Sequence, residues 1–193
     1  MNTSLDNGEH HHPLLRLLHA LINGYFRSIE VVGLENIPTN QGGLVVAAHP
    51  NGMIDPALII STLPRRVIFG ARDGLFRWPV LGKLMKDLGC VPIYRPQDNA
   101  HLSLEEQREL NRQSLAALTD EIRTGSFAAL FPEGISHDQP FIKQIRTGAA
   151  RIFWAAYDQD NAPVVLPVGL HYERKSHFRS RVLIQYHPPI NLN

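Results

Sequence analysis

The chain has 193 residues, of which 44% are hydrophobic and 19% charged, and its 19 basic and 18 acidic residues leave a net charge of +1. This length and composition predict one globular domain with a sizeable core. The even charge balance gives no electrostatic reason to expect a nucleic-acid partner. The single cysteine excludes an intrachain disulfide and fits a reducing compartment.

Residues 1–13 are polar and are expected to form a disordered lead-in to a domain that spans 14–193. Residues 14–27, "LLRLLHALINGYFR", place apolar side chains on one broad face of a helix. Such an amphipathic helix either packs on the core or lies in a membrane interface, and the sequence leaves both interpretations open. No stretch approaches the roughly 20 apolar residues that a membrane-spanning helix needs.

Beyond this helix, short apolar runs alternate with helical patterns. Runs rich in Val and Ile, separated by helices, predict a single layered α/β domain in which a mostly buried mixed sheet of about seven strands is flanked by helices. The expected strands are 28–33, 43–48, 66–71, 90–94, 127–131, 164–170 and 181–186, and the expected helices are 55–63, 79–88, 104–124 and 145–158.

Residues 49–55, "HPNGMID", contain a candidate catalytic pair, His49 and Asp55. Pro50 prevents the preceding strand from continuing, and Asn51–Gly52 permits a tight turn that brings Asp55 back from a helix start. In such a pair the histidine takes a proton from a substrate hydroxyl, while the carboxylate holds the ring in the right tautomer. The alternatives for His49 are a metal ligand or an ordinary polar residue in a turn.

Several other chemistries lack their sequence signatures. No G-x-S-x-G pattern is present, and Ser136, His137 and Asp138 are consecutive, so they cannot form a relay among themselves. Phosphate-loop, dinucleotide and zinc patterns are also missing. A metal site assembled from His49, Asp55 and His137 stays open as an alternative. A His–Asp pair without a protein nucleophile favours direct transfer, in which the hydroxyl of the substrate attacks.

Three further stretches carry polar residues at expected strand ends. Arg95 follows "GCVPIY" and is a fixed cation that can bind a phosphate in bidentate fashion. Glu133 and Gly134 follow "FAALFP" at the edge of the sheet where α/β proteins bind ligands. "VLPVGL" contains an internal proline and leads into a basic run with Arg179 and Arg181. Each has an ordinary alternative: a surface ion pair, a turn, an edge-strand or bulge proline, and a solvated basic face.

In this order, "HPNGMID", "GCVPIYR", "FPEG" and "VLPVGL" resemble the four blocks of the phospholipid/glycerol-3-phosphate acyltransferase family, from about residue 33 to 190. The resemblance implies that His49 is the catalytic base, that Asp55 orients it, that Arg95 binds the acceptor and that Pro167 lies on the acyl-donor side. The substrate-binding residues that it implies are Arg95, Phe131, Pro132, Glu133, Gly134 and Pro167, with Arg146, Arg179 and Arg181 as second-rank candidates.

Finer features resemble the branch that acylates glycerol 3-phosphate or dihydroxyacetone phosphate, although Gly52 stands where many members carry serine. The resemblance implies an enzyme of phospholipid biosynthesis that transfers a fatty acyl group from acyl-CoA or acyl-ACP to the hydroxyl of glycerol 3-phosphate or 1-acylglycerol 3-phosphate. The implied mechanism has no acyl-enzyme, no metal and no cofactor beyond the thioester co-substrate. The resemblance also implies a cytoplasmic protein that binds peripherally to the membrane surface. The alternatives are a non-catalytic lipid-binding module and a metal-dependent hydrolase.

Overall fold

The computed structural model describes residues 13–137, 139 and 141–192. The disordered lead-in expected for residues 1–13 therefore lies, apart from Pro13, outside the described residues. The strands are β1 (Ser28–Val32), β2 (Gly43–Ala47), β3 (Val67–Arg72), β4 (Val91–Ile93), β5 (Phe127–Leu130), β6 (Val164–Tyr172) and β7 (Arg181–Tyr186). The α-helices are α1 (Pro13–Tyr25), α2 (Ile54–Thr62), α3 (Pro79–Asp87), α4 (Leu104–Arg123) and α5 (Gly148–Ala156), and the short 3-10 helices are η2 (Leu34–Asn36), η3 (Asp73–Arg77) and η4 (Pro96–Asp98).

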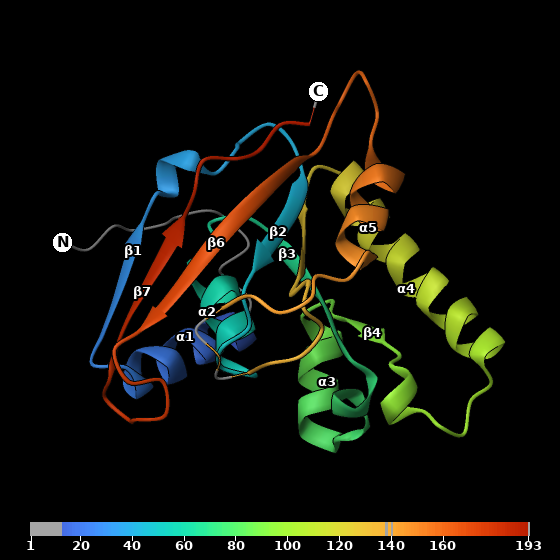
Figure 1. The fold of residues 1–193 in the computed structure, drawn as a ribbon. Helices are drawn as coiled ribbons and strands as arrows, with labels where there is room; N and C mark the ends of the chain where they lie inside the picture. The colour runs from blue at the N-terminus through green and yellow to red at the C-terminus, as the bar shows by residue number, and fades with distance from the viewer. Residues whose placement is uncertain (1–12, 138, 140, 193) are drawn as a thin grey trace.

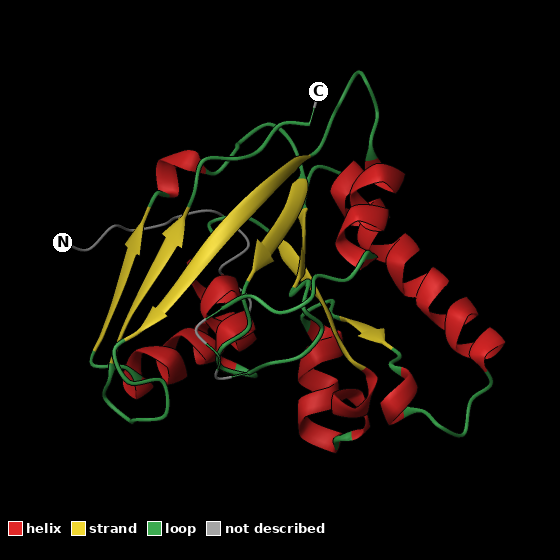
Figure 2. Cartoon of the chain, viewed as in Figure 1, coloured by secondary structure: helices red, strands yellow, loops and turns green. Residues whose placement is uncertain are grey.

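One seven-stranded sheet in the order β1-β7-β6-β2-β5-β3-β4 forms the centre of the molecule, with helices on both faces (Figures 1 and 2). Strands β6, β2, β5, β3 and β4 run parallel, whereas β7 runs antiparallel to β6 and carries β1 beside it. The expected mixed α/β sheet is confirmed. Every expected strand and helix is present, with ends that differ by a few residues.

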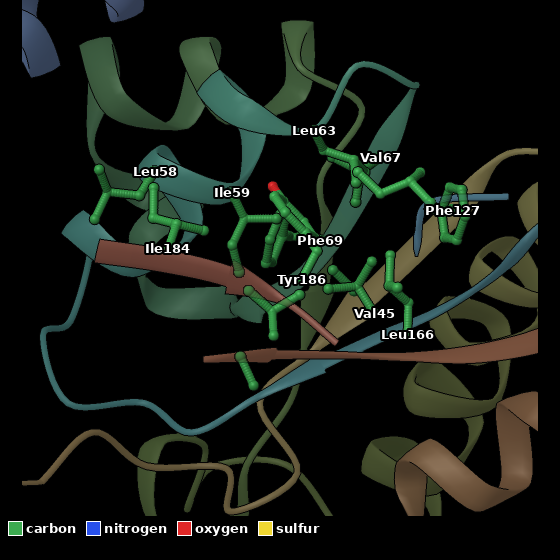
Figure 3. Close-up of a cluster of buried hydrophobic side chains, with 14 of the residues drawn as sticks. Val45, Leu58, Ile59, Leu63, Val67, Phe69, Phe127, Leu166, Ile184 and Tyr186 are labelled. Atoms are coloured by element: carbon green, nitrogen blue, oxygen red, sulfur yellow. The ribbon is translucent and has the colours of Figure 1, made fainter. Parts of the chain in front are cut away.

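Apolar side chains on both faces of the sheet hold the layers together. On one face α1 and α2 contribute Ile22, Leu58 and Ile59 to the larger cluster, and Figure 3 shows Leu58 and Ile59 against strand residues. On the other face α4 and α5 contribute Leu118 and Ile152. Burial of each such side chain stabilises the fold by about 1.5–3 kcal/mol, so the helices are fixed to opposite sides of the sheet.

The helices that follow β2 and β5 lie on opposite faces, although these two strands are neighbours. The connection from β2 enters α2, and the connection from β5 leads to α5. Adjacent parallel strands whose connections leave on opposite sides open a crevice at their carboxyl ends, which is where ligands bind in open α/β sheets. Residues 48–53 and 131–137 leave the sheet at this crevice.

The amphipathic helix expected at residues 14–27 is α1. Ile22 is buried, and Leu18 and Tyr25 pack on the core, so the core-packing interpretation holds for this face. Leu17 and Leu21 stay 56% and 61% exposed, so the helix also presents apolar side chains at the surface. Within the described part of the chain, none of the helices has the length and apolar character required to cross a bilayer.

Pro167 lies in an interior strand, so the edge-strand alternative is wrong. It sits in β6 opposite Val46 of β2, while β7 covers the other side of β6. Its carbonyl accepts from the N–H of His187 at 3.0 Å, just past the last ladder pair of Val168 with Tyr186. The backbone N and O of one strand residue point toward the same neighbouring strand, which for Pro167 is β7. The N–H that proline lacks would therefore point toward β7 at a position where the β6–β7 ladder has already ended. The interior strand therefore tolerates the proline.

Candidate active site

The segment after β2 turns so that His49 and Asp55 face each other. Pro50 follows the strand, and Gly52 adopts a φ of 39°, in the left-handed region that favours glycine. α2 then begins at Ile54 and carries Asp55 in its first turn. The Nδ1 atom of His49 lies 2.9 Å from Oδ2 of Asp55. The structure therefore brings the two candidate catalytic residues into direct contact.

Asp55 is fully buried and surrounded by hydrogen-bond donors. Its Oδ2 atom accepts from the N–H of Asn51 at 2.7 Å, and its Oδ1 atom accepts from the hydroxyl of Tyr172. Because a carboxylate can only accept, the proton between the pair belongs to Nδ1 of His49. The other ring nitrogen, Nε2, then carries the lone pair that a general base needs.

The imidazole plane of His49 is fixed by stacking. The rings of His49 and Phe131 lie 3.9 Å apart between centroids and 9° from parallel, and Phe131 stacks in turn on Phe69 of β3. The His49 side chain remains 17% exposed. Its Nε2 atom makes no hydrogen bond to any described residue. One ring nitrogen is therefore held, and the other is left for a ligand.

A second histidine–carboxylate pair lies in the loop after β5. Glu133 is buried, and its Oε2 atom binds Nε2 of His137 and accepts from the N–H of Lys143 at 2.7 Å. Burial opposes the ionisation of this carboxyl, but the hydrogen bonds outweigh it and hold the pKa of Glu133 below its ordinary value. The N–H of His137 donates to the carbonyl of His49 at 3.2 Å, so this loop supports the backbone of His49.

Gly134 and Arg146 are packed against each other. Gly134 has a φ of 70°, and a Cβ at this position would lie 3.0 Å from Nε of Arg146. The backbone N–H of Arg146 donates to the carbonyl of Pro132 at 2.8 Å, and its Nε donates to the carbonyl of Glu133 at 3.4 Å. Arg146, a second-rank candidate, therefore lies beside the "FPEG" block as an exposed residue.

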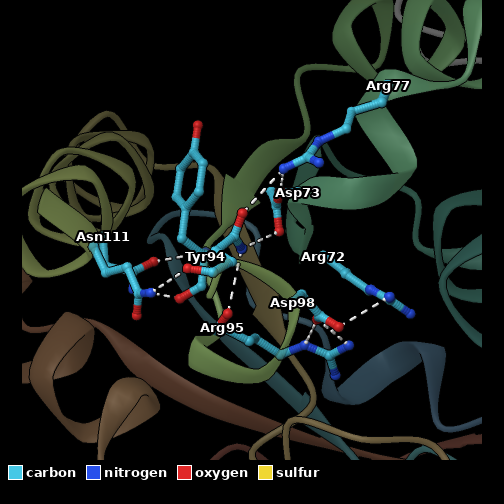
Figure 4. A network of polar contacts seen from close by, with 9 residues as sticks. Arg72, Asp73, Arg77, Tyr94, Arg95, Asp98 and Asn111 are labelled. Carbon is cyan, nitrogen blue, oxygen red and sulfur yellow. Dashed lines mark hydrogen bonds and ion pairs between the residues drawn. The ribbon is translucent and has the colours of Figure 1, made fainter. Parts of the chain in front are cut away.

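Arg95 is held by two partners, of which Figure 4 shows Asp98. Its Nη1 donates to the carbonyl of Gly134 at 2.9 Å, and its Nε donates to Oδ2 of Asp98 at 2.6 Å. The other oxygen of Asp98 pairs at 2.9 Å with Arg72, the last residue of β3. The ion-pair alternative for Arg95 is thus real, but two guanidinium groups share one carboxylate. The excess positive charge leaves this end of the site suited to an anion.

Arg179 lies in the connection from β6 to β7, and Arg181 is the first residue of β7, at the edge of the sheet where β2 also ends. Arg179 has a φ of 62°, its N–H donates to the carbonyl of Tyr25, and its side chain is exposed. Arg181 alternates with the buried Val182, so its side chain lies on the face of the sheet away from α1 and α2. The substrate-binding roles of both arginines stay predictions.

Three residues around the pair were not predicted as site residues: Tyr172, Lys175 and Asn51, the last of which was assigned to the turn alone. Nδ2 of Asn51 donates to the carbonyl of Lys175 at 3.0 Å, and Nζ of Lys175 donates to the carbonyl of Pro50 at 2.9 Å. Tyr172 binds Asp55 from 117 positions away, so no local spacing reveals the contact. The available signal was the polar run "HYERK", which includes the last two residues of β6 at the same edge of the sheet as His49.

The metal-site alternative required His49, Asp55 and His137 to come together. His49 bonds to Asp55, whereas His137 bonds to Glu133, so the two histidines belong to separate pairs. Across residues 13–137, 139 and 141–192, no three His, Cys, Asp or Glu side chains gather as metal ligands.

Comparisons with known proteins agree with this arrangement. The acyltransferase family profile matches residues 28–171. The chain is 35% identical over 82 residues to glycerol-3-phosphate O-acyltransferase 2 of Saccharomyces cerevisiae, and the aligned region covers 42% of this chain and 11% of that protein. It is 30% identical over 135 residues to lyso-ornithine lipid O-acyltransferase of Rhodobacter capsulatus, and the aligned region covers 70% of this chain and 44% of that protein. The crystal structure of the 1-acyl-sn-glycerophosphate acyltransferase PlsC from Thermotoga maritima matches with a TM-score of 0.66 and 19% identity, covering 93% of this chain and 68% of that chain.

The fold and the four ordered blocks thus define an α/β domain of the acyltransferase type. The chain belongs to the acyltransferase family, which confirms the resemblance seen in the sequence. The likeness to PlsC shows that the two chains share a fold. The chain spans less than half the length of either curated relative.

Proposed function

We propose that the protein transfers a fatty acyl group from acyl-CoA or acyl-ACP to a hydroxyl of glycerol 3-phosphate or 1-acylglycerol 3-phosphate. The observation that carries this proposal is the His49–Asp55 pair, in which Nδ1 is held by a buried carboxylate and Nε2 is open. The pair lies at the crevice where the connections of β2 and β5 diverge. The names of the yeast and Rhodobacter relatives support a glycerol-phosphate or lysolipid acceptor.

In the proposed reaction the acceptor hydroxyl attacks the thioester carbonyl directly. Nε2 of His49 takes the hydroxyl proton as the new C–O bond forms, and Asp55 stabilises the resulting imidazolium. The tetrahedral intermediate then expels the thiolate, which recovers the proton from His49. General-base assistance of this kind contributes on the order of 10²–10⁴ in rate. No covalent acyl-protein forms, and no residue other than His49 has to move a proton.

The acceptor phosphate is assigned to the positive end of the site. Arg95 and Arg72 both pair with Asp98, and a phosphate dianion competes well for such guanidinium groups because it accepts paired hydrogen bonds. Arg95 also binds the carbonyl of Gly134, which ties the phosphate end to the loop that supports His49. Pro167, on β6, is assigned to the acyl-donor side.

The protein is also proposed to act at a membrane surface, on its cytoplasmic face. Acyl-chain acceptors and products reside in bilayers, and the carboxyl-end edge of the sheet and α1, seen together at the lower side of Figure 1, carry many exposed apolar side chains. These residues are Leu17, Leu21, Met53, Trp78, Val80, Phe141, Ile142, Ile145 and Phe178. Co-sedimentation of the protein with anionic phospholipid vesicles, and its loss in a Leu17→Ser/Leu21→Ser variant, tests this arrangement.

A thioester-cleavage assay with a panel of acceptors, run in the presence of a chelator, tests the proposed activity. Acylated glycerol 3-phosphate or lysophosphatidate as product supports the proposal. Thioester cleavage that yields free fatty acid and stops in chelator would instead identify a metal-dependent hydrolase. Tight lipid binding without any cleavage would identify a non-catalytic lipid-binding module.

A further inference from the structure

The hydroxyl of Tyr172 contacts the active site but has no part in the acyl-transfer steps. It donates to Oδ1 of Asp55, while His49 and the N–H of Asn51 both use Oδ2. Among the described residues, Tyr172 is thus the partner of the second carboxylate oxygen. Burial, followed by the charge of Asp55, raises the pKa of Tyr172 above its ordinary value. The phenol therefore stays protonated and acts as a donor at every relevant pH.

The Tyr172 ring is itself fixed, which allows its hydroxyl to fix Asp55. The ring lies 6.1 Å from that of Phe26, a fully buried residue at the end of α1, and packs on the larger core cluster. The terminal torsion of an aspartate is broad when nothing restrains it. Donors on both oxygens stop this rotation and keep Oδ2 directed at His49.

The contact also changes how readily the His–Asp pair takes up a proton. A hydrogen bond donated to the carboxylate favours the state of the pair that carries one proton fewer, because that state has the greater negative charge. We propose that Tyr172 is a positioning residue that fixes the Asp55 carboxylate with Oδ2 directed at Nδ1 of His49, so that Nε2 of His49 stays the proton-accepting nitrogen. The kinetic part of this inference rests on the proposed acyl-transfer function, and the titration part does not.

A titration of the His49 ring reports on Tyr172 only if the other ionisable groups near the His49–Asp55 pair are the same in the wild type and the variant. The charged or titratable residues that face it from the neighbouring segments are Tyr25 of α1, Glu133 and His137 after β5, and Lys175 after β6. Replacement of a hydroxyl by hydrogen at Tyr172 leaves all four in place. A change in titration can then be assigned to the lost donor.

Tyr186 provides a matched control. It is a buried tyrosine on the neighbouring strand β7, and burial likewise raises its pKa. Its hydroxyl lies 2.8 Å from that of Thr62, a neutral partner away from the catalytic pair. Tyr172→Phe and Tyr186→Phe each remove one buried hydroxyl, but only the first removes a donor to Asp55.

The experiment is an NMR titration of the His49 ring without substrates, with its signals assigned by their absence in His49→Ala. Tyr172→Phe should move the pH midpoint of these signals upward by up to about one unit, because only part of the energy of a hydrogen bond to a carboxylate differs between the two states of the ring, and Tyr186→Phe should leave the midpoint in place. In steady-state assays Tyr172→Phe should lower kcat about tenfold at neutral pH with both KM values nearly unchanged, and it should move the acid limb of the profile upward.

An unchanged midpoint in Tyr172→Phe, or an equal shift in Tyr186→Phe, would overturn the assignment. Because the midpoint is measured without substrates, absence of acyl transfer in the wild type would reject the proposed function without touching this result. 3-Fluorotyrosine at position 172 preserves the side-chain shape and is a stronger donor, so it should move the midpoint downward even if Tyr172→Phe fails to fold. No movement with that analogue would equally overturn the assignment.

Discussion

Two histidine–carboxylate pairs follow neighbouring strands of the sheet, His49–Asp55 after β2 and His137–Glu133 after β5. In the first pair Nδ1 is bonded to the carboxylate, and Nε2 is open on a side chain that is 17% exposed. In the second pair Nε2 is bonded to the carboxylate, and Nδ1 accepts from the N–H of Gln139 at 3.2 Å. A histidine paired with a carboxylate therefore leaves one ring nitrogen unused in the first pair and none in the second, and only the first pair has the form of a base.

The second pair supports the first rather than duplicating it. The N–H of His137 donates to the carbonyl of His49, and Glu133 also accepts from the backbone of Lys143. Loss of this pair should therefore loosen the loop around His49, whereas loss of the first pair should remove the chemistry.

Asp55→Asn should give the largest loss, on the order of 10²–10⁴ in kcat, with the fold retained. An amide can donate to Nδ1 of His49, which shifts the ring proton to Nε2 and removes the base. Steady-state kinetics together with circular dichroism measures both properties. A variant that keeps more than about a tenth of wild-type activity would contradict the orienting role, given the size of general-base effects.

Arg95→Ala should raise the acceptor KM about ten- to a hundredfold and leave the donor KM nearly unchanged, because hydrogen bonds to a charged group are lost. Arg95→Lys should recover part of the loss, since an ammonium keeps the charge without the paired geometry. Arg77→Ala is the control, because Arg77 pairs with Asp73 in the adjacent network shown in Figure 4. A defect in the donor KM would move Arg95 to the thioester side.

His137→Ala should cost about 1–3 kcal/mol of folding stability at neutral pH, because ionised Glu133 stays buried with one partner fewer. In the wild type the pKa of Glu133 is lowered from 4.5, so its contribution to stability is present above that value and is lost as the pH falls through the folded pKa. The stability difference between wild type and variant should therefore narrow in acid. Denaturant unfolding at pH 7 and at mildly acidic pH measures it, and a difference independent of pH would count against the assignment.

Ser136→Ala should have the smallest effect, within about twofold, because the exposed hydroxyl lies outside both pairs. No acyl label should remain on the protein when the thioester is supplied without acceptor. Mass spectrometry of the intact protein checks this. A stoichiometric acyl adduct would replace direct transfer with a covalent mechanism.

Local sequence patterns predicted most of the fold. Val- and Ile-rich runs marked the strands, and the helix expected from residue 104 is α4, which begins there with a capping box between Ser103 and Glu106. The turn at Gly52 also followed from residue type. These features depend on neighbours in the chain, which a sequence displays directly.

The parts of the site that depend on long-range contacts were less accessible. Tyr172 meets Asp55 only because β6 and β2 pair in one register, and periodicity does not fix which strands are neighbours. The sharing of Asp98 between Arg72 and Arg95 likewise depends on the pairing of β3 with β4. Sequence named the chemical groups, and the sheet order determined which of them meet.

The most direct test of the central claim compares initial rates of acyl transfer for His49→Ala and His137→Ala at saturating donor and acceptor, after circular dichroism shows both to be folded. We expect His49→Ala to lose on the order of 10²–10⁴ in rate and His137→Ala to stay within about tenfold of the wild type. Equal losses in the two variants, or a greater loss in His137→Ala, would contradict the assignment of His49 as the base.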